Sequence, residues 1–278
     1  MHDRRSTIAL HSTGVARGSF VQSREFEWLS RGGFVARALV YGIIGILALK
    51  LAFGHGGKLT NQQGALHTVA HQPFGKVLLA LVAVGLGGYS LWRLVRAAIG
   101  HGPEGSDSGF ERVAALASGI AYGAICAVAV QILLGSGEGN AGNPKQAAGG
   151  VLGWPAGTWI VGIAGGVMIG VALYQGYRGT TKRFLKDSKV EEMPAQAKKW
   201  ISRLGTIGHL ARMVVFGLIG VFLVRAAIDY NPNKAVGLDG ALAKLIHHSY
   251  GPVLLGIVAA GLIAFGLYSL SDARYRRI

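Results

Sequence analysis

The chain has 278 residues, of which 51% are hydrophobic and only 15% are charged, and its formal net charge is +15. A soluble domain has about a quarter of its residues charged, so this composition excludes an ordinary water-soluble protein. The apolar residues gather in six blocks, and each is long enough to cross a bilayer, which requires about 20 residues per helix. The sequence therefore predicts an all-α polytopic membrane protein with six transmembrane helices.

The positive charge follows position along the chain. Lysine and arginine number nineteen in the N-terminal segment, the second and fourth connections and the C-terminus, but only five in the other three connections. Because these residues concentrate on the cytoplasmic side of short loops, both termini are predicted to be cytoplasmic. Topology accounts for the charge, so no nucleic-acid partner is expected. Anionic head groups of membrane lipids on the cytoplasmic side are the expected partners.

The first repeat follows a polar tail. Residues 1–27 lack the apolar core of about 7–15 residues that a cleavable signal peptide needs, so we expect a flexible cytoplasmic tail. Repeat 1 covers 28–100 and contains spans at 33–53 and 77–99. Between these spans, Leu66, Val69 and Ala70 are at helical spacing, which predicts a short interfacial helix.

The second repeat covers 109–178, with spans at 113–134 and 155–174. Cys126, the only cysteine, lies mid-membrane in the first of these spans and is interpreted as a small packing residue. Small residues at four-residue spacing permit close helix contact in lipid. We therefore expect close neighbours at the following glycines: Gly119 and Gly123 in the third span, and Gly162, Gly166 and Gly170 in the fourth.

The third repeat, at 200–278, follows a basic cytoplasmic linker at 179–199. Its spans are predicted at 207–228 and 251–270, with another short interfacial helix within 238–253. Tryptophans near span boundaries act as anchors at the membrane surface. The chain has five in such positions: Trp28, Trp92, Trp154, Trp159 and Trp200.

The chain repeats internally. Shifted by 175 positions, "ARALVYGIIG" from Ala36 lies over "ARMVVFGLIG" from Ala211. A weaker middle copy places Tyr122 over Tyr41 and "PAG" at 155–157 over "PFG" at 73–75. Each copy is two spans joined by an external connection, which predicts three parallel hairpins around a pseudo-threefold axis along the membrane normal.

These residues define a pattern of a Trp, an "ARxxVYGxIG" helix, a "GAL" segment, a "PFG" turn and a helix ending in Tyr and Trp. The chain resembles the bacterial membrane proteins of the domain-of-unknown-function 1206 family, in which such a hairpin typically occurs three times. The match extends from about Trp28 to the C-terminus, and the middle copy departs from it, with Ser118 in place of arginine and no "GAL". The resemblance implies residence in the bacterial inner membrane but no established activity.

Two arginines near the starts of spans are candidate site residues. Arg37 and Arg212 are equivalent in the repeat, and Ser118 takes this place in the middle copy. Each arginine lies about 6 to 8 Å inside its span, so its side chain can snorkel to the boundary or bind a lipid phosphate. Alternatively, the three residues form a partial ring on the axis, as a site for an anion or a lipid head group.

Other polar residues give weaker signals. Lys50, Gln131 and Arg225 are equivalent near the external ends of spans and are interpreted as snorkelling anchors, with a second polar ring as the alternative. The external segments contain His67, His71, His247 and His248. No cysteine or carboxylate cluster completes a metal set, so no metal is expected. His209 alone lies within a span, which argues against a bis-histidine haem, and no cofactor is expected.

No hydrolase or phosphate-loop motif is present, so an enzyme is not expected. The first functional hypothesis is a structural or lipid-interacting membrane component, acting as a homo-oligomer or with another membrane protein. The alternative is a transporter or channel for a small anionic or neutral solute, and a weaker one is binding of an apolar cofactor between helices. A continuous polar cavity on the axis would favour transport, whereas a packed axis would favour the structural hypothesis.

Overall fold

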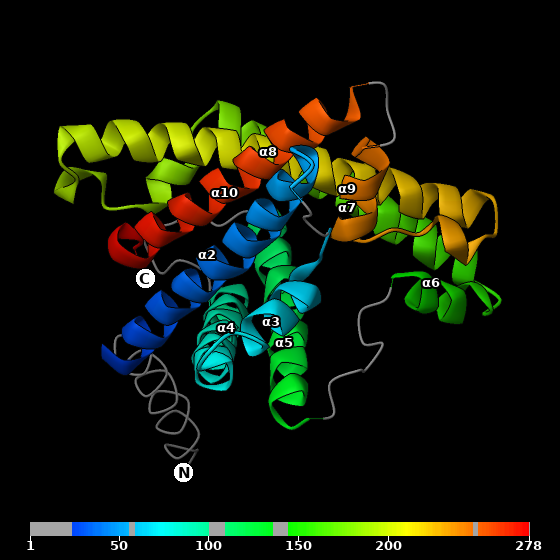
Figure 1. Ribbon diagram of the computed structural model, residues 1–278, viewed down its shortest axis with the longest axis horizontal. Coiled ribbons are helices and arrows are strands. Elements are labelled where there is room, and N and C mark those ends of the chain that lie inside the picture. The colour runs from blue at the N-terminus through cyan, green and yellow to red at the C-terminus, as the bar shows by residue number, and fades with distance from the viewer. Residues whose placement is uncertain (1–23, 56–58, 100–108, 136–143, 247–249, 278) are drawn as a thin grey trace, which may run out of the picture.

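The computed structural model describes residues 24–55, 59–99, 109–135, 144–246 and 250–277, which form an all-helical fold (Figure 1). Its six long helices are α2 (Arg24–Ala52), α4 (Gly75–Ile99), α5 (Gly109–Leu133), α7 (Gly157–Thr180), α8 (Ala195–Ile228) and α10 (Gly251–Tyr275). Each is long and apolar enough to cross a membrane. The predicted all-α protein with six spans is therefore confirmed, while most of the predicted tail lies outside the described residues.

Short helices occupy the connection within each repeat. The predicted ones are present as α3 (Gln62–Ala70) and α9 (Leu238–Ile246), and the second copy adds α6 (Pro144–Leu152). Leu66 and Leu242 are fully buried, so α3 and α9 direct these side chains into the protein, whereas an interfacial helix would direct them into lipid. Short 3₁₀ helices complete the description: η1 (Arg183–Asp187), η2 (Val190–Glu192) and η3 (Pro232–Lys234).

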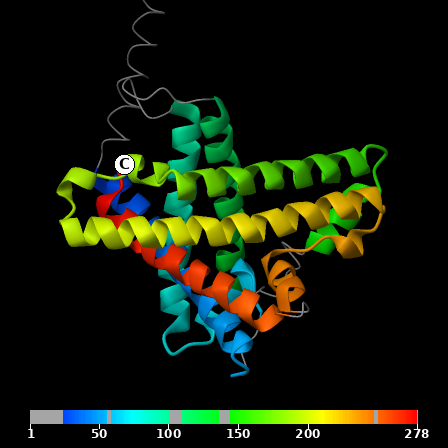
Figure 2. The same cartoon turned by 90° about the horizontal axis from the view of Figure 1, so that it is seen from above.

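The six spans form three pairs that cross one another steeply (Figure 2). Helix α4 lies against α5, α7 against α8, and α10 against α2. Each pair joins the second span of one repeat to the first span of the next, and the last pair closes the circle. The same pairing thus occurs three times, as a pseudo-threefold arrangement of parallel hairpins requires.

Small residues allow each pair to cross closely. A Cβ atom on Gly45 would collide with α10, and one on Gly220 would collide with the backbone of Gly165 in α7. Cys126 occupies the corresponding position in α5, 81 residues after Gly45, and its Sγ donates to the Ala83 carbonyl at 3.2 Å. The structure therefore supports the interpretation of this cysteine as a small packing residue.

The hairpin of the second repeat is open. Helix α2 packs on α4 and α8 packs on α10, but α5 and α7 make no comparable contact among the described residues, and their far ends diverge in Figures 1 and 2. Gly85 lets α4 approach Ala36 of α2, and Gly261 lets α10 approach Ala211 of α8. The equivalent residue of the second copy is Val167, which is 58% exposed. Its larger side chain explains the missing contact.

The glycine predictions are partly confirmed. Gly119 and Gly123 lie against Leu94 and Ser90 of α4. In α7 the prediction was wrong for Gly166 and Gly170, beside which a Cβ atom would meet open space. The face of α7 that meets α8 instead presents buried Gly165, Gly176 and Gly179.

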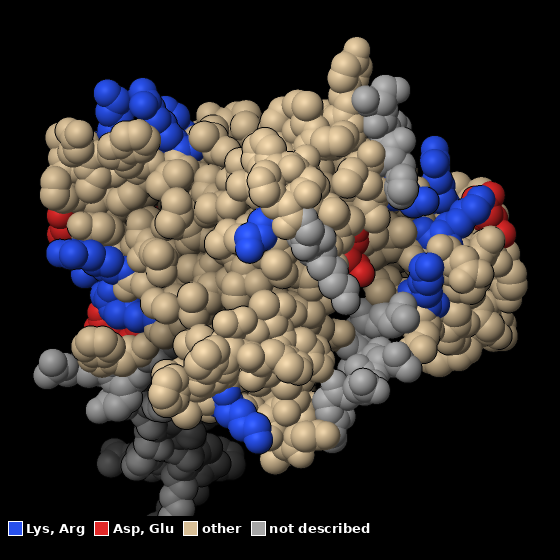
Figure 3. All heavy atoms as spheres, viewed as in Figure 1, with Lys and Arg blue, Asp and Glu red and all other residues tan. Residues whose placement is uncertain are grey.

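Four of the five tryptophans are exposed, as anchors would be: Trp28, Trp154, Trp159 and Trp200. The prediction was wrong for Trp92, which is 5% exposed and packs against the rings of Phe34 and Tyr89 at 5.4 and 5.5 Å. On the face in Figure 3, lysine and arginine gather mainly toward two opposite ends, and most of the middle is uncharged. An uncharged middle suits the hydrocarbon core of a bilayer.

Candidate functional site

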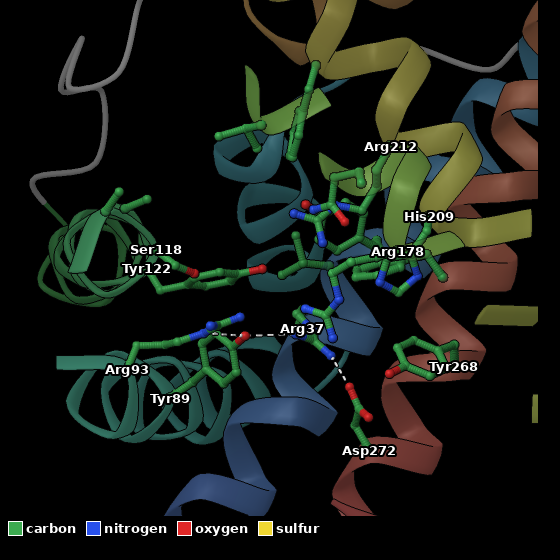
Figure 4. A pocket seen from close by; sticks show the side chains of 18 of the residues that line it. Arg37, Tyr89, Arg93, Ser118, Tyr122, Arg178, His209, Arg212, Tyr268 and Asp272 are labelled. Carbon is green, nitrogen blue, oxygen red and sulfur yellow. Dashed lines mark hydrogen bonds and ion pairs between the residues drawn. The ribbon is translucent and has the colours of Figure 1, made fainter. Parts of the chain in front are cut away.

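A cavity of about 360 Å³ lies between the spans and is lined by residues of all six (Figure 4). Its wall includes Arg37, Ser118 and Arg212, so the structure brings together the three residues predicted to share a ring. They come from α2, α5 and α8, the first span of each repeat. We call the end of the bundle where these three helices begin the basic end.

Arg37 is buried and neutralised within the protein, and it does not snorkel. Its side chain is 5% exposed, and one guanidinium nitrogen lies 2.8 Å from Asp272 Oδ2. The other nitrogens donate to Ser269 Oγ at 3.0 Å and to the Tyr89 hydroxyl at 2.8 Å. Sequence reasoning missed Asp272. Its position near the end of the last span does not by itself indicate that it faces α2.

Arg212 has no carboxylate partner among the described residues. Its guanidinium lies over the rings of Phe265, Phe216 and Tyr41 at 4.4, 4.7 and 5.5 Å, and its buried Nε makes no hydrogen bond. With the amide oriented to accept, the Gln175 oxygen lies 3.3 Å from both terminal nitrogens. Aromatic faces and one amide therefore replace the carboxylate that Arg37 has.

The cavity has an excess of positive charge. Its lining contains six arginines and two aspartates: Arg37, Arg93, Arg96, Arg178, Arg212 and Arg276, with Asp187 and Asp272. Isolated charges are costly within a membrane unless they face water or a partner. The lining therefore has four more arginines than carboxylates.

Both aspartates belong to one network at the basic end. Asp187 of η1 accepts from Arg178 at 2.7 Å and from Arg276 at 2.9 Å, and Asp272 lies 3.4 Å from Arg276. Burial alone would lower the pKa of Arg276, but the carboxylates of Asp272 and Asp187 raise this pKa above its usual value. The two acids thus hold Arg37, Arg178 and Arg276. Arg93 instead donates to the Tyr89 hydroxyl at 3.0 Å.

The remaining predicted residues lie apart from this network or contribute by packing. Lys50, Gln131 and Arg225 are exposed and outside the cavity, so they form no second ring there. His209 lines the cavity, stacks on Phe184 at 4.9 Å and has its Nδ1 2.7 Å from the Gly205 carbonyl. Among the described residues no cluster of three or more potential ligands could hold a metal, and His247 and His248 lie outside them.

Three two-span units around one internal cavity define a polytopic membrane protein built from tandem helical hairpins. The family model described as Domain of Unknown Function (DUF1206) matches residues 32–100, 113–182 and 207–276, and the chain belongs to this family. It is also 32% identical over 267 residues to the uncharacterized protein YxxB of Bacillus subtilis (strain 168), covering 94% of this chain and 96% of that protein. No solved structure matches the chain.

The family match relates the cavity residues of the three copies. The second and third segments begin 81 and 175 residues after the first, and they end 82 and 176 residues after it. These offsets make three further sets equivalent: Tyr41, Tyr122 and Phe216; Tyr89, Val171 and Phe265; and Arg96, Arg178 and Asp272. Because all nine line the cavity, the cavity lies on the pseudo-threefold axis.

Proposed function

We propose that this protein is a non-enzymatic, lipid-interacting membrane component whose central cavity binds a phosphate or carboxylate group. The observation on which this depends is the set of six arginines against two aspartates in one cavity between the spans. An anionic ligand would offset the cost of the excess charge. Guanidinium groups also match the geometry of phosphate and carboxylate oxygens.

Arg212 is the central ligand-binding residue in this proposal. It lies in the cavity wall without a carboxylate, and its Nε has no hydrogen-bond partner. Arg93 reaches the same cavity from α4, and Ser118 and Tyr122 supply hydroxyl donors from α5, as Figure 4 shows. Charged and neutral donors would thus surround a bound anion from several sides.

The basic end is proposed to face the cytoplasm of a bacterial cell. This orientation rests on the nineteen lysines and arginines of the N-terminal segment, the second and fourth connections and the C-terminus, because such residues are retained on the cytoplasmic side. The anion site would then lie in the cytoplasmic half of the bilayer, close to anionic head groups.

Transport of a small anionic solute is the second candidate. It is favoured by the extent of the cavity lining, which includes Arg276 at the basic end and Gln62 of α3 in the connection at the opposite end. Uptake of radiolabelled phosphate into proteoliposomes distinguishes the two candidates, because a binding component without a transport cycle would accumulate none.

Equilibrium dialysis of the purified full-length protein against radiolabelled inorganic phosphate tests the binding proposal. Loss of a charged hydrogen-bond donor predicts that Arg212→Gln weakens binding about tenfold or more. Arg225→Gln is the matched control, because Arg225 is an exposed arginine of the same helix outside the cavity. Equal phosphate affinity of Arg212→Gln and wild type would contradict the proposal.

A further inference from the structure

We infer that the ligand is an anionic membrane phospholipid, whose phosphate enters the cavity from the side of the bundle, between α5 and α7. This inference rests on the proposed anion site and adds the chemical class of the ligand and its route. We call the opening between these two helices the lateral gap. Ala117 and Ala121 of α5 and Val167 of α7 mark its edges.

The lateral gap connects the cavity to the outside of the bundle. Helices α5 and α7 make no substantial contact among the described residues, and Val167 stands where the closed hairpins have glycine. Ala117 and Ala121 are exposed and also line the cavity. Small side chains facing both the cavity and the outside leave room for a group to pass between the helices.

A strap formed by residues 187–189 and 275–277 lies at the basic end of the cavity, whose lining includes Asp187 and Arg276. The Lys189 N–H donates to the Tyr275 carbonyl at 2.7 Å, and the Arg277 N–H donates to the Asp187 carbonyl at 3.0 Å. Asp187 also holds Arg276 at 2.9 Å. A route that passes between these two segments must break these bonds, whereas the side route breaks none of them.

The depth of the site suits a lipid head group. Ser118 lies five residues after Val113, where the sequence predicts that the α5 span begins, which is about 8 Å along the helix axis. A phosphate at this depth lies just inside the head-group region of the leaflet. The acyl chains can remain outside, along the apolar side chains that α5 and α7 expose, such as Ile120 and Ile163.

The charge distribution favours an anionic lipid over a zwitterionic one. Arg212 of α8 and Arg93 of α4 have no carboxylate partner among the described residues, and each belongs to a helix pair beside the lateral gap. The neutralised pair of Arg37 and Asp272 belongs to α2 and α10, opposite the gap. A net negative head group entering here therefore meets the side of the cavity whose guanidinium groups have no carboxylate partner among the described residues.

Native mass spectrometry of the full-length protein, incubated with equal amounts of phosphatidylglycerol and phosphatidylcholine, tests the inference. Wild type is expected to retain phosphatidylglycerol in preference. Val167→Trp narrows the lateral gap from a position outside the cavity lining and is expected to reduce bound phosphatidylglycerol about tenfold or more, while binding of inorganic phosphate by dialysis stays within about twofold of wild type. Val84→Trp is the matched control, because Val84 is a similarly exposed valine of α4 outside the cavity lining.

The outcomes separate this inference from the proposed function. If Val167→Trp and Val84→Trp retain phosphatidylglycerol equally, lateral entry is overturned and the anion site stands. Equal retention of the two lipids by wild type overturns the choice of an anionic lipid. Failure of the anion site itself would appear in the dialysis experiment, as equal affinity of Arg212→Gln and wild type for inorganic phosphate.

Discussion

Two helix pairs place an arginine at the same position of the repeat and compensate its charge differently. In the α2 and α10 pair, Arg37 is 2.8 Å from Asp272. In the α8 and α7 pair, the equivalent arginine is Arg212, and the position of Asp272 is occupied by Arg178. A cation thus stands in place of the carboxylate, and among the described residues the guanidinium of Arg212 faces aromatic rings and the amide of Gln175.

The third pair has a carboxylate at neither of these two equivalent positions. In α4 and α5, Arg96 takes the position of the aspartate and Ser118 takes that of the arginine. Among the three equivalent positions of Arg96, Arg178 and Asp272, one therefore holds a carboxylate. The ion pair of Arg37 with Asp272, which we call the clasp, joins α2 to α10. The other two helix pairs place arginines in the cavity wall on both sides of the lateral gap.

Removing the carboxylate of the clasp should have the largest effect. Asp272→Asn leaves Arg37 and Arg276 without this partner in a buried site, and breaking a buried ion pair typically costs about 3–5 kcal/mol in the free energy of unfolding. Unfolding with denaturing detergent measures the loss. Asp229→Asn is the control, since the surface pair of Asp229 with Lys234 contributes about 1 kcal/mol or less. Equal stability of the two variants would show that the ion pairs of Asp272 do not stabilise the fold.

The two equivalent arginines should differ in the same assay. Arg37→Gln removes charged hydrogen bonds to Asp272 and Tyr89 and is expected to lower the free energy of unfolding by about 2–3 kcal/mol. Arg212→Gln removes an uncompensated charge, so its stability is expected to stay within about 0.5 kcal/mol of wild type. A loss in Arg212→Gln as large as in Arg37→Gln would make Arg212 a structural residue.

Most of the fold could be predicted because bilayer thickness imposes it on the sequence. Apolar blocks of sufficient length predicted all six spans, and the motif shared by residues 36–45 and 211–220 predicted the internal repeat. Hydropathy shows where a helix crosses lipid but not where it ends. Helix α8, for example, begins at Ala195, before the span predicted from residue 207. Its first turns contain the exposed residues Lys198 and Lys199.

The site could be predicted only in part, because its chemistry depends on which repeats are neighbours. The repeat identified Arg37, Ser118 and Arg212 as one set, and they share the cavity. The helix that packs against each of them belongs to the preceding repeat around the circle. The sequence of a single hairpin does not show which repeat is its neighbour. The available signal was the offset of 176 residues, which places Asp272 over Arg96 and marks a reversal of charge at one position.

The closed and open hairpins give a further test. A side chain on Gly85 would collide with the Gly32 carbonyl of α2, so Gly85→Val is expected to lower the free energy of unfolding by about 1–3 kcal/mol, as overpacking does. The same change at Gly170 of α7 meets open space and is expected to cost less than about 0.5 kcal/mol. A stability loss in Gly170→Val comparable to that in Gly85→Val would mean that α7 has a close neighbour on this face.

A single isosteric change should give Arg212 the carboxylate that Arg37 already has. In Gln175→Glu, a carboxylate oxygen replaces the amide oxygen that lies 3.3 Å from both terminal nitrogens of Arg212. The excess charge of the cavity falls by one, and the guanidinium proposed to bind the ligand becomes occupied. Phosphate affinity in dialysis is expected to fall about tenfold, while the unfolding midpoint stays the same or rises. Gln72→Glu adds the same charge at an exposed position outside the cavity and should leave affinity unchanged. If Gln175→Glu binds phosphate as tightly as wild type, the difference between the two arginines has no role in ligand binding.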